Sequence, residues 1–515
     1  MSFLVEQKIG KHIYVYETQS YWDKDKKQSR QKRRYVGKKD IVSGETTTPR
    51  KTKRAEQVQD YGHVYLAKYI AKQIGLDECI KEVFADNAEE VSHLMYHQVL
   101  EASPFYMQKS WAEGVYVPKT ACIPSQKISS LLASIGESEN KPFDFFKAWI
   151  KKQKDLEGAW LDITSVSTYS NNLDFAEWGY NRDKESLPQI NLGYLIGYPS
   201  QLPLFYQTYP GSINDVITIK NTIKLANNFG VKINNLVMDR GFYSLANIKE
   251  LSSNKFNFII PLPSTIKEVK NILQQSKEGL KNTNSFCQNN KIMFYWNTSI
   301  QLDGIDLKIC VYLDEKKRAI ELENFMGHLH ELEDKFKQLA FESQDQAAIY
   351  INDNWNKYAK FYQVITQNKK IILERNNTAI SDNIAKFGKM ILATNNNNLD
   401  HESMIALYRQ RDGIEKAFDV MKNDLHEYRL RTSANKTTNG KIFVTFLSVI
   451  LYSALLQLMR PSLIKKFTVA EIFSELKKIR VVKLDDTECY LTEISKTQRL
   501  IFKELGIPVP EAPSY

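Results

Sequence analysis

The pattern of hydrophobic and polar positions changes near residue 157 and divides the chain into parts with different predicted structures. Between residues 55 and 150, apolar side chains recur at helical spacing, for example at 65–74, which predicts a small helical domain. After residue 157 the apolar residues form short runs bounded by Gly and Pro, which is typical of strands. A mostly helical N-terminal domain followed by an α/β core is therefore predicted.

The first part of this core contains seven predicted elements. Three apolar runs joined by turns predict an antiparallel meander, and the segments after it alternate between helix and strand, in the order β-β-β-α-β-α-β. The predicted strands are 159–166, 189–196, 202–209, 236–239 and 256–260, and the predicted helices are 215–230 and 244–252.

Further along the chain the regular alternation stops. A long charged helix is predicted at 319–362 and one more strand at 390–394. The predicted parts are a basic N-terminal strand or hairpin arm (1–54), a helical DNA-binding domain (55–150), the first part of the core (155–265), an inserted α+β domain (266–388), the second part of the core (389–460), and a C-terminal tail for dimerisation or DNA contact (461–515).

The charge of the chain favours a polyanionic partner. Lys and Arg number 70 against 60 Asp and Glu, which gives a net charge of +10 and a pI near 9.0. Nucleic acid is the first candidate and an anionic membrane the second, while a soluble basic protein without such a partner is the simpler alternative. The basic stretch at 24–39 has two open interpretations, a solvated hairpin and a contact to the DNA backbone.

The compartment is predicted from the cysteines and the apolar segments. The five cysteines are scattered without Cys-x-x-Cys pairs, which fits a reducing cytosol and neither a disulfide framework nor a zinc site. The first residues lack the apolar core of a signal peptide. The apolar stretch 442–459 is long enough to raise the question of a membrane span, but its Ser, Thr and Gln residues favour a buried core helix. A cytoplasmic, nucleoid-associated protein without a membrane partner is expected.

Four polar residues at spacings of three, four and seven positions form the most specific pattern in the sequence: Tyr408, Arg411, Glu415 and Lys422. On one helix turning about 100° per residue, they lie within an arc of roughly 60°. The apolar residues among them share another arc, which predicts a helix with one buried face. A carboxylate flanked by two cations suits a place where a metal ion meets a phosphate chain. Ordinary surface pairing of Arg411 with Glu415 is the alternative.

Two further carboxylates lie on predicted strands of the core. Asp162 interrupts an apolar strand, where an unpaired charge is costly, and Asp239 ends the fourth strand before an Arg-Gly turn. Considered alone, Asp162, Asp239 and Glu415 each have an ordinary explanation: an edge position, a turn or cap, and a surface ion pair. Considered together they favour one cluster, because the first and fourth strands are neighbours in a ribonuclease H-like sheet and a later helix packs against the same end.

These motifs resemble those of DDE-type transposases of bacterial insertion sequences, in the group with a Tyr-x2-Arg-x3-Glu-x6-Lys signature. The signature is matched without substitution, and the interval of 176 residues from Asp239 to Glu415 fits a group with a β-rich insertion before the last carboxylate. The resemblance covers about residues 157–460 and implies a ribonuclease H-like core with an inserted domain. The matching segments are 161–169, 190–193, 210–215, 237–243 and 408–422.

The resemblance implies an enzyme that cleaves double-stranded DNA at the inverted-repeat ends of an insertion sequence and joins the 3′ ends to target DNA. Asp162, Asp239 and Glu415 would be its catalytic and metal-binding residues, holding two Mg2+ ions for which Mn2+ can substitute. Water would be the first nucleophile and a 3′-hydroxyl the second, without a covalent protein intermediate. A homodimer on paired ends is implied as well.

Contacts to DNA are implied for residues beside these carboxylates. Arg411 and Lys422 would grip terminal phosphates, and Tyr408 would stack on a base or hydrogen-bond a phosphate. Arg240, which follows Asp239, is expected on the same DNA strand. Trp296 in the insertion has two interpretations, an aromatic that stabilises a flipped base and a core tryptophan.

Two other functions remain compatible with the sequence. A catalytically inactive or domesticated transposase would bind DNA without cutting it, although all three carboxylates and the signature are present. A host nuclease on the same fold would cut without requiring a particular terminal sequence, because a fold does not determine a function.

Overall fold

The computed structural model of the chain describes residues 2–23, 27–48, 55–138, 140–154, 156–231, 234–280, 284–288, 291–367, 370–484 and 488–513. The chain divides into two compact units. The first unit comprises Met1–Gln59, Ile479–Ile494 and Glu511–Tyr515, and the second comprises Asp60–Lys478 and Ser495–Pro510.

The first unit is built from strands. Its four-stranded antiparallel sheet has the order β1-β2-β3-β4, and most of the basic stretch predicted at 24–39 forms β3 with largely exposed side chains. Residues 24–26 of that stretch lie outside the described residues. The predicted helical domain begins later than expected, because residues 55–60 pair with a C-terminal strand in the sheet β19-β18-β5. The strands are β1 (Ser2–Ile9), β2 (His12–Asp23), β3 (Gln28–Lys39), β4 (Thr46–Thr47), β5 (Ala55–Asp60), β18 (Arg480–Leu484) and β19 (Glu488–Leu491).

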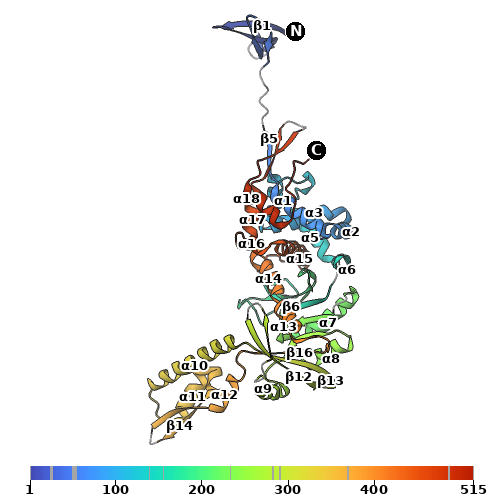
Figure 1. Cartoon of the computed structure of the whole chain (residues 1–515). Coiled ribbons are helices and arrows are strands. Elements are labelled where there is room, and N and C mark those ends of the chain that lie inside the picture. The colour runs from blue at the N-terminus through green and yellow to red at the C-terminus, as the bar shows by residue number, and fades with distance from the viewer. Residues whose placement is uncertain are drawn as a thin grey trace. The chain divides into compact units, whose positions relative to one another are not determined.

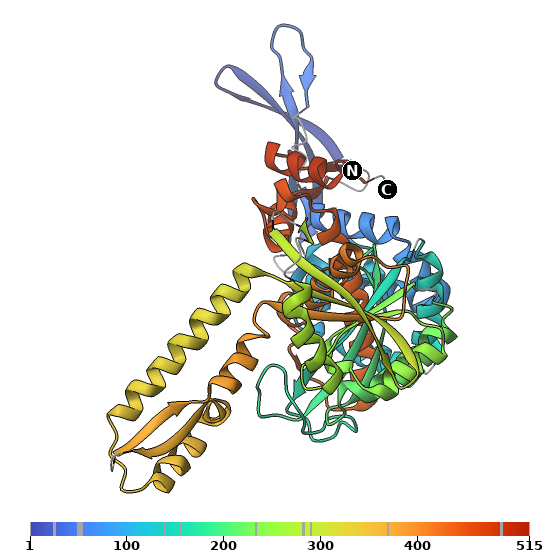
Figure 2. The same ribbon diagram turned by 60° about the horizontal axis from the view of Figure 1, so that its bottom comes forward.

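A ten-stranded sheet forms the centre of the second unit (Figures 1 and 2). The strand order is β11-β12-β13-β16-β10-β9-β6-β7-β8, and β17 pairs with β6. Strands β6, β9 and β10 are parallel, whereas β7 and β8 continue the sheet as an antiparallel meander. The strands are β6 (Gly158–Thr168), β7 (Gln189–Tyr198), β8 (Pro203–Pro210), β9 (Asn235–Met238), β10 (Phe258–Pro261), β11 (Ser285–Gln288), β12 (Lys291–Leu302), β13 (Ile305–Leu313), β16 (Lys389–Thr394) and β17 (Arg429–Leu430).

Helices cover both faces of this sheet. Tyr194 of β7 packs its ring against Phe418 and Phe446, at centroid distances of 5.4 and 5.7 Å, on the helices that follow β16. Tyr209 of β8 points to the opposite face, where its hydroxyl lies 3.2 Å from the hydroxyl of Thr222. From β6 to β10, strands and helices occur in the predicted order. The helices are α7 (Asp215–Asn228) and α8 (Leu245–Ser253), then α13 (His401–Arg409), α14 (Asp412–Asp419) and α15 (Asn435–Leu458).

The long apolar helix α15 is a core helix, as the sequence predicted. Among the described residues it is the one helix long and apolar enough to cross a membrane, but 78% of its most apolar window is buried. Helices α3 and α5 pack against it, and Gln98 of α3 hydrogen-bonds the hydroxyls of Thr445 and Ser448 at 3.0 and 2.8 Å. The N-terminal helices therefore share a core with the sheet. They are α1 (Gly62–Gln73), α2 (Leu76–Phe84), α3 (Ala88–Glu101), α4 (Gln108–Gly114), α5 (Ser125–Glu137) and α6 (Asn140–Lys152).

The inserted region predicted at 266–388 has two structural parts. After α9, strands β11 to β13 extend the central sheet through the pairing of β13 with β16. The long helix predicted at 319–362 is two helices, because Ser343 caps a new one, and these join a hairpin around a separate core that includes Phe325, Leu329 and Trp355 (Figure 1). The elements are α9 (Lys267–Gly279), α10 (Glu315–Lys337), α11 (Gln344–Trp355), β14 (Tyr362–Gln367), β15 (Lys370–Arg375) and α12 (Asn377–Ile384).

Much of the predicted C-terminal tail is helical. Capping boxes at Thr468 and Ser495 begin two amphipathic helices with buried apolar faces. A role in dimerisation or DNA contact stays a prediction. The helices are α16 (Pro461–Ile464), α17 (Val469–Lys477) and α18 (Lys496–Leu505).

Candidate active site

The two aspartates belong to neighbouring parallel strands, Asp162 within β6 and Asp239 directly after the end of β9. The register of β6 and β9 pairs Leu161 with Met238, so the next residues, Asp162 and Asp239, are at the same level of the sheet. Asp162 is also opposite Tyr194 of β7, and directly opposed residues share a face. Both aspartates are therefore directed to the face that α13 and α14 cover.

The helix predicted for Tyr408, Arg411, Glu415 and Lys422, which we call the stripe, is interrupted. Tyr408 lies in α13, which ends at Arg409, and Glu415 lies in α14, which begins at Asp412. Arg411 occupies the turn between them, where the backbone makes i to i−3 hydrogen bonds, and Lys422 lies in a π-helical turn, η6 (Val420–Asp424). The prediction of one continuous helix was wrong, because periodicity alone does not report the poor helix propensity of the adjacent Asp-Gly pair.

Arg411 links the carboxylates of the sheet and the helix. Its Nη2 donates to Glu415 Oε1 at 3.1 Å, and its Nη1 lies 2.8 Å from Asp239 Oδ1, an ion pair without hydrogen-bond geometry. The guanidinium also lies 5.4 Å from the centroid of the Tyr408 ring, and the Tyr408 hydroxyl donates a long hydrogen bond, 3.5 Å, to Asp239. The pairing of Arg411 with Glu415 is thus present, and the same side chain reaches Asp239.

Burial perturbs the titration of this cluster. It raises the pKa of Asp162 to about 6, although the Ile163 N–H, Arg411 and Arg182 favour the charged form. Burial also raises the pKa of Tyr408 to about 12. Burial lowers the pKa of Arg411, but Tyr408 and the surrounding carboxylates outweigh it and raise that pKa. A charged Arg411 beside a half-buried Asp162 therefore characterises the site.

The residue types at this site fit divalent metal ions. Three carboxylates supply the hard oxygen atoms that Mg2+ and Mn2+ prefer. Within the described part of the chain, however, no group of three or more His, Cys, Asp or Glu side chains is arranged to hold a metal ion. Asp239 and Glu415 are instead paired with Arg411.

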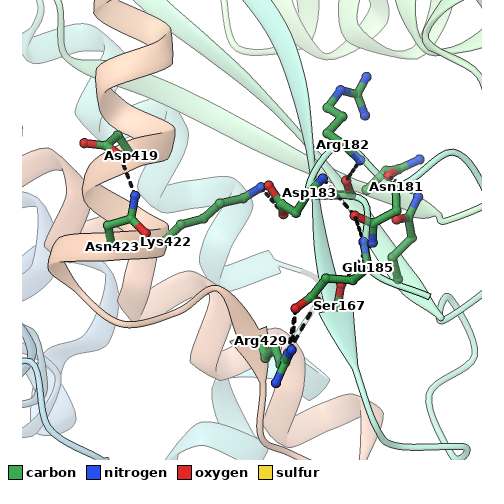
Figure 3. Close-up of polar contacts among 12 residues, drawn as sticks. Ser167, Asn181, Arg182, Asp183, Glu185, Asp419, Lys422, Asn423 and Arg429 are labelled. Carbon is green, nitrogen blue, oxygen red and sulfur yellow. Dashed lines mark hydrogen bonds and ion pairs between the residues drawn. The ribbon is translucent and has the colours of Figure 1, made fainter. Parts of the chain in front are cut away.

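Lys422 does not contact these carboxylates. Its Nζ lies 2.6 Å from Oδ2 of Asp183, in the segment between β6 and β7 (Figure 3). The same segment provides Glu185, which pairs with Arg429, and Arg182, which binds Asp215 at 2.6 Å. We call residues 169–188 the β6–β7 loop.

Sequence reasoning missed the β6–β7 loop as part of the site. Arg182 acts electrostatically on Asp162, and Asp183 holds Lys422, yet neither belongs to a periodic pattern. The segment 210–215, noted for its resemblance to transposases, contains the partner of Arg182, Asp215.

Two residues with predicted DNA roles, Arg240 and Trp296, are not among the contacts described for Arg411. Arg240 is exposed in the 3₁₀ turn η4 (Arg240–Phe242) that follows Asp239. Trp296 is half-buried in β12, with its indole against Gly279 of α9: a Cβ on that glycine would lie 2.5 Å from the ring. Packing on α9 favours the core interpretation of Trp296, and the DNA contact of Arg240 stays a prediction.

Comparison with known proteins gives one family match. The family model described as "Transposase DDE domain" matches residues 153–451, which include both aspartates and the whole stripe. No curated protein matches the chain. A solved structure, the cryo-EM structure of the piggyBac transposase synaptic complex with hairpin DNA, aligns with a TM-score of 0.33 and 13% identity, over 81% of this chain and 70% of that chain. A TM-score this low does not establish a common fold.

Proposed function

Because the chain belongs to the family of DDE transposases, we propose that it cleaves DNA at the inverted-repeat ends of a bacterial insertion sequence and joins the 3′ ends to target DNA. The supporting observation is the level register of Asp162 and Asp239 on parallel strands, with Glu415 linked to Asp239 through Arg411. Arg411 thus pairs with two of the carboxylates and acts electrostatically on the third, Asp162.

The strand order supports a ribonuclease H-like core. Strands β8-β7-β6-β9-β10 are adjacent in that order, and β7 alone among them runs against the direction of β6. Helix α14, which carries Glu415, contacts β6 and β7. This topology gives a sheet position to two carboxylates and a helix position to the third.

In the proposed site, Asp162, Asp239 and Glu415 hold two Mg2+ ions, or Mn2+ in their place. The ions would activate the attacking oxygen and stabilise the leaving one. Asp162 must be in its charged form to serve as a ligand, and burial raises its pKa to about 6 in the absence of a bound cation.

The basic residues of the site position the DNA strand. Arg411 would transfer its guanidinium from the carboxylates to a phosphate, since its fork geometry suits both anions. Tyr408 holds that guanidinium through its ring and restricts where it points. Lys422 and the exposed Arg240 are proposed phosphate contacts on either side.

A cleavage assay tests the proposal. The substrate is a duplex that ends in the inverted repeat read from the DNA flanking the coding region, incubated with the full chain and Mg2+. Glu415→Gln should abolish cleavage and retain binding. The matched control is Glu402→Gln on the preceding helix, because the Glu402 side chain is 61% exposed and that of Glu415 is 59% exposed. The control variant should cleave normally.

The assay also separates the alternatives. Binding without cleavage under Mg2+ and Mn2+ would indicate a catalytically inactive DNA-binding transposase. Cleavage that is independent of the terminal sequence would indicate a nuclease. We further propose a homodimer on paired ends, acting in the cytoplasm on nucleoid DNA, which light scattering of the complex with end duplexes would test.

A further inference from the structure

The β6–β7 loop exposes an unusual number of large aromatic side chains. The exposed fractions are 67% for Tyr169, 67% for Trp178 and 81% for Tyr180. Aromatic rings in ordered proteins are normally covered, and a group of exposed rings marks an interaction surface.

The loop is held firmly by polar contacts. Glu177 and Gln189 exchange backbone hydrogen bonds of 3.0 Å, and the side chain of Asn181 donates to Ser167 Oγ at 3.0 Å. The ion pair of Asp183 with Lys422 ties the loop to the turn after α14 (Figure 3). The rings of Trp178 and Tyr180 are therefore carried by an anchored backbone, which reduces the entropic cost of binding to them.

Guanidinium groups alternate with rings at the start of this loop. Arg429, on the strand beside β6, lies 5.1 Å from the ring centroid of Tyr169 and 5.5 Å from that of Tyr428. Arg431 lies 5.8 Å from the Tyr428 ring. Glu185 also pairs with Arg429. Two tyrosine rings and two guanidinium groups therefore lie close together at this place.

We propose that this surface, formed by Tyr169, Trp178, Tyr180, Tyr428, Arg429 and Arg431, binds unpaired nucleotides of a DNA strand next to the active site. Rings stack on any exposed base, and guanidinium groups stack on bases or bind phosphates. Paired bases are already stacked in a duplex, so the ligand must be a single strand. The same loop contributes the partner of Lys422 and the charge of Arg182 near Asp162, which places the strand beside the carboxylates. The inference rests on the proposed action on DNA.

Binding of fluorescein-labelled DNA to the full chain tests this surface. The two probes are a blunt duplex and the same duplex with a six-nucleotide thymine overhang, measured by anisotropy in EDTA so that no cleavage occurs. The overhang should tighten binding about tenfold, and Tyr169→Ala should remove most of that gain, roughly 5- to 10-fold, with little effect on the blunt probe. Tyr169→Phe should retain the preference, because stacking needs the ring and not the hydroxyl.

Trp22→Ala is the matched control, since Trp22 is 62% exposed and belongs to the first unit. The proposal is overturned if Tyr169→Ala keeps the preference for the overhang, if Trp22→Ala loses it equally, or if both probes weaken together. The binding assay needs no catalysis. If the unmodified chain cleaves end duplexes but does not prefer the overhang probe, the stacking surface is refuted and the transposase reaction is not. A preference without any cleavage would leave the surface in place and refute the transposase reaction.

Discussion

Lys422 Nζ lies 2.6 Å from Asp183 Oδ2, so the last residue of the Tyr-Arg-Glu-Lys stripe binds the β6–β7 loop. The lysine side chain is 12% exposed and the aspartate 38%, which leaves the carboxylate the more accessible partner. In the proposed function, a DNA phosphate that approaches from solvent would compete with Asp183 for the same ammonium group.

Replacing Asp183 with Asn should strengthen DNA binding. The variant frees Lys422 from its partner, and a partly exposed ion pair is worth about 0.2–1 kcal/mol, so affinity for a blunt duplex should rise about 1.5- to 5-fold at low salt. Anisotropy titrations over a range of salt concentrations measure the effect. Asp334→Asn, in the exposed pair with Lys337, is the control and should change nothing. Unchanged affinity in Asp183→Asn would show that the pair with Lys422 is purely structural.

Replacing Arg411 with Gln should separate binding from catalysis. The variant removes the positive charge that contacts both Asp239 and Glu415, and loss of one preorganised charge at a reacting phosphate typically costs about 100- to 1000-fold in rate. Single-turnover cleavage of end duplexes should fall by that factor while duplex affinity changes little. Arg409→Gln, whose guanidinium binds Gln288 in another direction, should cleave at nearly the normal rate.

The raised pKa of Asp162 predicts a pH-dependent cost to stability. With a folded-state pKa of about 6 and an ordinary value of 3.8, the folded chain binds the proton more tightly, so stability falls as pH rises from about 4 to 6. Asp162→Asn should therefore stabilise the chain by on the order of 2–3 kcal/mol above pH 6, and by nothing near pH 3.5. Urea unfolding in EDTA at several pH values measures this difference. A constant difference across that range would contradict the assigned pKa.

Close helix packing predicts a large effect for one glycine. A Cβ on Gly440 of α15 would lie 1.9 Å from the carbonyl oxygen of Leu132 on α5, so Gly440→Ala must force the helices apart. We expect a loss of about 1–3 kcal/mol or more in urea unfolding. Gly327→Ala in α10, where nothing lies within 4 Å, should instead stabilise its helix by about 0.5–1 kcal/mol. Equal effects at the two positions would contradict the close contact of α5 with α15.

Sequence reasoning succeeded where local patterns carry the information. Short apolar runs predicted the strands next to Asp162 and Asp239. The structure has the predicted order of strands and helices from β6 to β10. The break at Arg411 was missed because the spacing of apolar residues does not report the poor helix propensity of the adjacent Asp412 and Gly413. The partner of Lys422 was missed because Asp183 lies in a loop whose position depends on contacts distant in sequence, which no periodicity reports.

The extension of the sheet was missed for a related reason. Strands β12 and β13 lie in the region predicted as an inserted domain, and the pairing of β13 with β16 shows that they belong to the central sheet. Pairing between strands far apart in sequence depends on chain topology, which the residues of a single strand do not encode.

The pairing of Leu313 with Lys389 closes the region between them at its base. The chain leaves the sheet at this pair of residues and returns at the same pair. In topological terms, α10, α11, α12 and the hairpin of β14 and β15 are therefore an enlarged connection between two antiparallel strands. Such a connection can be lengthened, shortened or exchanged while the strand pairs beneath it stay intact. The chain can therefore vary this lobe in evolution at little cost to the strands that carry Asp162 and Asp239.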